Sequence, residues 1–160
     1  MNLRREWTFD DAERKRLAEN DGPWLDEPDK VQWVSTTGFD CLMVRNRMGV
    51  WCGYVGVTAE HPWFEQDYSD VDAEVHGGLT FTDFCQSGKE EARGVCHVPF
   101  AGRTARIWWL GFDTGHAYDF VPSWGQDLHS PGDVYRGQRY VEQEVETLAQ
   151  QALATMEGGQ

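Results

Sequence analysis

The sequence predicts one α+β domain: a mostly antiparallel sheet with a short N-terminal helix and a long C-terminal helix. Three observations support this fold class: a capped polar stretch near the N-terminus, strand-like runs joined by glycine turns, and a final apolar stripe at helical spacing. A chain of 160 residues is long enough to bury one core. We therefore assign residues 1–157 to a single domain and residues 158–160 to a short flexible tail.

The first helix is expected over residues 9–19. Thr8 followed by Asp11 resembles a capping box with aspartate in place of glutamate, and Asp21-Gly22-Pro23 ends the helix. The basic run Arg14-Lys15-Arg16 is typical of a solvated helix face.

The central strands follow from β-branched and aromatic runs separated by glycine. Residues 40–46 and 50–57 flank Arg47-Met48-Gly49, which predicts a hairpin. Residues 71–82 predict a strand interrupted by a glycine pair. Residues 105–112 form the most apolar run, as expected of a central strand.

The last predicted element is a helix from Val134 to Met156. Apolar residues recur there at three- and four-residue spacing, and glutamate and glutamine occupy the opposite face. The apolar positions are Tyr140, Val141, Val145, Leu148, Ala152 and Met156.

Charge and composition exclude several classes of protein. With 27 acidic and 14 basic side chains, the formal charge of −13 opposes general nucleic-acid binding. No apolar run approaches the roughly 20 residues of a membrane helix, and the N-terminus lacks the apolar stretch of a signal peptide. We therefore expect a cytoplasmic protein that does not enter a membrane. Its four cysteines (Cys41, Cys52, Cys85 and Cys96) form no CxxC pair and are expected to be reduced.

The first candidate segment for chemistry is residues 70–80. In an extended chain, its carboxylates and His76 share one face, and its valines and alanine share the other. Gly77 and Gly78 remove side chains beside the imidazole, so a ligand or another backbone can approach, and Thr80 can bond a ligand oxygen. The alternative is an edge strand whose charges prevent sheet pairing.

The second candidate segment follows the apolar strand. Asp113, His116 and Asp119 lie just beyond its end, where a rigid strand fixes polar groups and a loop exposes them. The three residues are candidate ligands of a divalent metal ion, or Asp113 orients His116 as a general base. The alternative is an aspartate that caps the turn and a surface histidine.

We group His76, Asp113 and His116 as the candidate catalytic constellation, with His97 or Glu74 as further members. Two histidines and a carboxylate can exchange protons around a phosphoryl group or bind a transition metal. Three more residues are candidate ligand contacts. Trp109 could stack on a planar group of the ligand, and Arg103 and Arg106 could bind its phosphate. No Walker A loop or GxGxxG motif is present in the sequence.

Several segments together are similar to a family of small proteins from bacteriophages and bacterial genomes. They are Cys52-Gly53-Tyr54-Val55-Gly56-Val57, His76-Gly77-Gly78-Leu79-Thr80, and Trp108-Trp109-Leu110-Gly111-Phe112-Asp113 with His116-Ala117 and Asp119. The resemblance extends from about Trp24 to Ala149 and implies one coherent domain with both candidate segments in its signature. It implies no particular activity. A phage protein of this kind would act in the host-cell cytoplasm, where a counter-defence role is expected.

Two functions of different classes follow. The first is a small-molecule site for a nucleotide-derived signalling ligand, which the protein sequesters or hydrolyses, in the second case as a phosphodiesterase-like hydrolase. The alternative is an acidic interaction protein that inhibits a protein partner, for instance by mimicking the charge of DNA. A homo-oligomer is compatible with either function.

Overall fold

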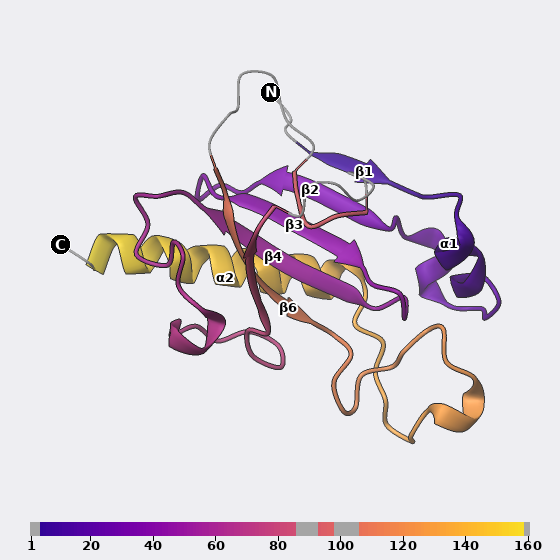
Figure 1. The fold of residues 1–160 in the computed structure, drawn as a ribbon. Helices are drawn as coiled ribbons and strands as arrows, with labels where there is room; N and C mark the ends of the chain where they lie inside the picture. The colour runs from indigo at the N-terminus through magenta and orange to yellow at the C-terminus, as the bar shows by residue number, and fades with distance from the viewer. Residues whose placement is uncertain (1–3, 86–92, 98–105, 159–160) are drawn as a thin grey trace.

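The computed structural model describes residues 4–85, 93–97 and 106–158, and its centre is a six-stranded sheet. The strand order is β1-β2-β3-β4-β6-β5, and every neighbouring pair is antiparallel (Figure 1). The strands are β1 (Arg5–Trp7), β2 (Lys30–Val34), β3 (Asp40–Arg45), β4 (Trp51–Val57), β5 (Phe81–Phe84) and β6 (Trp108–Asp113). The helices are α1 (Ala12–Leu17) and α2 (Gln138–Gly158), with 3-10 turns η1 (Pro23–Asp26), η2 (Tyr68–Asp70) and η3 (Gln126–Leu128). The predicted α+β class is confirmed.

The β3–β4 hairpin forms where the sequence predicts it. Arg45 pairs with Trp51 across the turn, and Gly49 supplies the positive φ of 81° that the turn needs. Every residue of both strands is buried, so the hairpin lies at the centre of the sheet with both faces covered.

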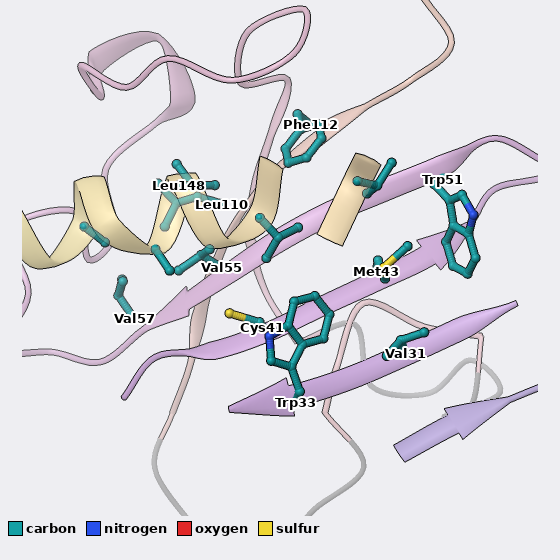
Figure 2. Packing of buried hydrophobic residues seen from close by; sticks show 14 of the residues in the cluster. Val31, Trp33, Cys41, Met43, Trp51, Val55, Val57, Leu110, Phe112 and Leu148 are labelled. Carbon is teal, nitrogen blue, oxygen red and sulfur yellow. The ribbon is translucent and has the colours of Figure 1, made fainter. Parts of the chain in front are cut away.

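Helix α2 covers one face of the sheet and forms the main core with it (Figures 1 and 2). The predicted apolar stripe is responsible: Val141, Val145 and Leu148 are fully buried against the strands. Gly53 of β4 allows the close approach, because a Cβ atom there would lie 2.6 Å from Val145 Cγ2. The helix begins four residues later than Val134, the start expected from sequence, and continues to Gly158.

Residues 93–97 cover the opposite face of the sheet, where Val95 packs with Leu42, Tyr54 and Trp109. The buried Lys30 of β2 holds this segment, since its Nζ donates to the carbonyl oxygens of Gly94 (3.3 Å) and Cys96 (2.9 Å). The sequence therefore predicts helices on one side of the sheet but does not reveal the cover on the other.

The expectation of four reduced cysteines is wrong for two of them. Cys85, just after β5, and Cys96 of the covering segment form a disulfide, with Cα atoms 4.7 Å apart. Cys41 and Cys52 are free and buried. Burial, assisted by the nearby charge of Asp113, raises the pKa of the Cys52 thiol to about 12.

The N-terminal helix is shorter than residues 9–19 and begins after Asp11, whose side chain accepts a hydrogen bond from Arg14 N. The basic run is only partly a solvated face, because the Arg14 guanidinium turns inward. It donates to the carbonyl oxygens of Leu25 and Glu27 and lies 3.0 Å from Asp29 Oδ1.

Glu27 links this N-terminal region to the sheet and to α2. Its carboxylate accepts hydrogen bonds from Arg45 Nη2 (2.8 Å), Trp51 Nε1 (3.2 Å) and Tyr135 OH, and from Gln138 N (2.9 Å) at the start of α2. Burial alone would raise the pKa of Glu27, but these donors and the charge of Arg45 outweigh burial and lower the pKa.

The strand expected over residues 71–82 does not form at residues 71–80. Only residues 81 and 82 of that range are in a strand, as the start of β5. The predicted alternation is present, since Val71, Ala73 and Val75 pack on the core. The backbone at Glu74 and His76, however, bonds to side chains of α2: Gln151 Oε1 accepts from Glu74 N at 2.7 Å, and Glu144 Oε1 accepts from His76 N at 2.8 Å. The segment joins the sheet at its end, where Thr80 N donates to Gly111 O of β6 at 2.9 Å.

Strand β6 forms within the predicted run of 105–112 but begins later, at Trp108, and ends one residue later, at Asp113. Residues 106 and 107 lie outside the strand, and residue 105 lies outside the described residues. Among the described residues, the structure contains no helix long and apolar enough to cross a membrane.

Candidate functional site

Three chain segments meet beyond the end of β6 and bring the predicted histidines and carboxylates together. His76 comes from the extended segment before β5, Asp113, His116 and Asp119 from the end of β6 and its following loop, and Tyr140 from the first turn of α2. We call these five residues the histidine cluster. The two imidazole rings have centroids 6.1 Å apart, so the predicted constellation of His76, Asp113 and His116 assembles in one place.

His76 is held at both ring nitrogens. Its Nε2 donates to Asp119 Oδ2 at 2.8 Å, since a carboxylate can only accept, and its Nδ1 lies 2.7 Å from Tyr140 OH. Burial and the charges of Glu144 and Asp119 raise the pKa of Tyr140 against the opposing charge of Arg136, so its hydroxyl remains a donor. His76 N also donates to Glu144 Oε1 at 2.8 Å, which fixes the backbone.

Asp119 is the centre of the cluster, and its side chain is only 1% exposed. Besides His76, its carboxylate accepts from His116 N (3.1 Å) and from Arg136 Nε (3.0 Å). A buried carboxylate needs such donors to offset the loss of water. Asp119 therefore positions both histidines, one through its ring and the other through its backbone.

His116 and Asp113 form the accessible half of the cluster. Their side chains are 35% and 33% exposed, and His116 Nε2 lies 3.3 Å from Asp113 Oδ1. The two atoms are close enough for an ion pair but are not aligned for a hydrogen bond. Nε2 is itself buried and has no hydrogen-bond partner among the described residues. Asp113 is fixed by Gly115 N at 2.9 Å and by Thr80 Oγ1 at 3.4 Å.

The glycine pair allows the His116 ring to lie where it does. Gly77 has a φ of 69°, and a Cβ atom on it would lie 2.4 Å from both Nε2 and Cδ2 of His116. Gly78 has a φ of 82° and nothing within 4 Å of its Cβ position. The two glycines therefore differ: the first makes room for an imidazole, and the second borders open space.

The candidate metal ligands Asp113, His116 and Asp119 do not converge as a metal site. Within the part of the chain that the structure describes, no group of three His, Cys, Asp or Glu side chains is arranged to hold a metal ion. Asp119 directs its oxygens to His76, Arg136 and the backbone of His116 instead.

Two residues predicted as ligand contacts lie away from the cluster. Trp109 is fully buried under residues 93–97 and belongs to the core, because the second face of the sheet is covered. Arg106 lies before the opposite end of β6 from Asp113, about 20 Å away along the strand, and stacks on Phe84. The third, Arg103, lies outside the described residues.

The further candidates also serve other roles. His97 Nε2 lies 2.7 Å from the Cys41 carbonyl oxygen on the far side of the sheet, and Glu74 bonds Gln151 through its backbone. His61 is buried against the carbonyl oxygen of Ala152, and this burial lowers its pKa.

Sequence reasoning missed Tyr140, Glu144 and Arg136. The sequence pattern places Tyr140 only in the apolar stripe of α2, although its i, i+4 relation to Glu144 puts both on one helix face and gives a usable signal. Arg136 lies outside α2, and nothing in its local sequence indicates a partnership with Asp119.

The fold and the cluster define the class: an α+β domain with two aspartate–histidine pairs beyond one end of its sheet. Comparison with protein-family models, with curated proteins and with solved structures found no match to this chain.

Proposed function

We propose that the histidine cluster binds a small nucleotide-derived ligand and hydrolyses it by acid–base chemistry. The observation that supports this most directly is the pairing of a half-buried His116–Asp113 with a buried His76–Asp119. In this proposal His116 exchanges a proton with the ligand or with attacking water, and Asp113 stabilises the protonated imidazole. His76, whose ring nitrogens are both engaged, is a positioning residue.

The test incubates pure protein with nucleotides, cyclic oligonucleotides and ADP-ribose derivatives, with and without Mg²⁺ or Mn²⁺. The filtrate is analysed by chromatography before and after heat denaturation. A new product supports hydrolysis, and a compound that disappears and returns intact on heating indicates a protein that sequesters its ligand. If every compound remains unchanged, the small-molecule proposal is wrong.

Variants connect the activity to the cluster. His116→Gln should lower the rate by about 100-fold or more, because a general acid or base contributes about 10²–10⁴-fold. Asp113→Asn should also lower it. Asp70→Asn removes one exposed carboxylate outside the cluster and is the matched control for charge, so its rate should equal that of the wild type.

One observation favours the alternative, an acidic protein that binds and inhibits a protein partner, for instance by mimicking the charge of DNA. No Lys or Arg occurs from residue 48 to residue 88, and six carboxylates between Glu60 and Glu74 are exposed. The variant Asp67→Asn/Asp70→Asn/Asp72→Asn separates the two functions. If the histidine cluster is the functional site, this variant should retain ligand hydrolysis. If the exposed carboxylates bind a protein partner, the variant should bind that partner more weakly, and the binding should be sensitive to salt.

A further inference from the structure

Tyr118 combines two features that are costly for the fold. The residue is 72% exposed, although a tyrosine ring gains stability when it is buried. Its φ of 73° lies in the left-handed region, which bulky residues rarely adopt. Strained, exposed residues of this kind cluster at ligand-binding sites.

The surroundings hold Tyr118 in this conformation. Asp119 N donates to His116 O at 3.0 Å, which places Tyr118 at the third position of a four-residue turn. Val134 N donates to Tyr118 O at 2.8 Å and fixes the turn from the other side. Glycine or asparagine fits a position with positive φ better, so the turn itself does not require a tyrosine.

The turn joins the two halves of the histidine cluster. Consecutive Cα atoms are about 3.8 Å apart, so the Cα of Tyr118 lies within about 8 Å of the Cα of His116. The ring of Tyr118 is thus carried on the same turn as the half-buried imidazole of His116. It is the most exposed of the large apolar side chains that the structure describes.

We infer that Tyr118 is the stacking surface for a planar aromatic ring of the ligand, a nucleobase, while the sugar-phosphate part lies at His116. This inference rests on the proposed function and adds the ligand group that would be recognised. Stacking on an aromatic ring tolerates different bases, because every base has a π face.

The test compares the binding of AMP and ribose 5-phosphate by calorimetry, with wild type, Tyr118→Asn, Tyr118→Phe and Tyr68→Asn. Wild type should bind AMP about 5- to 150-fold more tightly than ribose 5-phosphate. Tyr118→Asn should abolish this preference without weakening ribose 5-phosphate binding, and Tyr118→Phe should keep it. Tyr68 is also exposed but lies in η2, so Tyr68→Asn should behave as wild type.

Thermal unfolding gives a readout that needs no ligand. Asparagine tolerates positive φ, so Tyr118→Asn should unfold at the same temperature as wild type or about 2–4 °C higher. A lower unfolding temperature would show that the ring supports the fold and would overturn the inference. Equal affinity of wild type for AMP and ribose 5-phosphate would overturn the stacking role alone, whereas binding of neither would overturn the proposed function and the inference with it.

Discussion

Replacing Gly77 by alanine tests the arrangement of the cluster directly. The new Cβ would lie 2.4 Å from His116 Nε2, whereas ordinary contacts begin at 3.4 Å, so the ring must retreat by about 1 Å. The ring is partly exposed and can swing outward, so we expect displacement of His116 rather than a large loss of stability from the clash. A misplacement of this size can cost about 100-fold in rate at a catalytic group.

Gly78→Ala is the matched control for ring position. Both glycines have positive φ, so each alanine should lower the free energy of unfolding by about 1–2 kcal/mol, but only the Cβ at position 77 meets the imidazole. The assay is NMR of the imidazole proton on Cε1 of His116, assigned with His116→Gln, together with urea unfolding of both variants. If this signal does not move in Gly77→Ala, or moves equally in both variants, the reasoning is refuted.

Three further predictions concern stability. Glu27→Gln removes the charge of a largely buried carboxylate and turns one of its two acceptor oxygens into a donor that faces other donors. It should lower the free energy of unfolding by about 3–5 kcal/mol at pH 7. The pKa of Glu27 is lower in the folded protein than in the unfolded chain, where it is about 4.3. The stability that the ionised carboxylate contributes is therefore complete above about pH 4.3 and is lost as the pH falls through the folded pKa. The urea unfolding curves of Glu27→Gln and wild type should converge in acid. Reducing the Cys85–Cys96 disulfide, which spans 11 positions, should cost about 3 kcal/mol in the same assay, and the double serine variant should not respond to reductant. Gly53→Ala should cost about 1–3 kcal/mol through overpacking against α2, whereas Gly125→Ala, with open space around it, should stay within about 0.5 kcal/mol; equal losses would contradict the packing argument.

The parts of the fold that depend on local pattern were predictable. The β3–β4 hairpin has a glycine turn between two apolar runs, and α2 has a continuous stripe at helical spacing. Strand β1 was not predicted, because Arg5–Trp7 is short, polar and paired only along one edge. The alternation in residues 71–80 predicts which side chains pack on the core. It does not show whether the backbone of this segment bonds to a neighbouring strand or to side chains of a helix.

The candidate site was predictable in part for the same reason. His76 and Asp119 lie 43 positions apart, so only the glycine pair and the end of an apolar strand marked them as neighbours of a site. The sequence predicts Trp109 as a ligand contact, whereas it is buried in the core, because the cover on the second face of the sheet comes from a short segment with no strong pattern. The Cys85–Cys96 disulfide likewise depends on tertiary contact rather than on spacing.

The position of Asp119 has a consequence for local unfolding. Its buried carboxylate accepts from the extended segment through His76, from its own loop through His116 N, and from the start of the α2 region through Arg136. None of these three donors belongs to the sheet, so they are joined to one another through a single side chain. In amide hydrogen exchange, residues around 76, 116 and 136 should therefore open together, at a lower free energy than β3 and β4. The site would then be a cooperative unit of its own, able to open while the sheet stays folded.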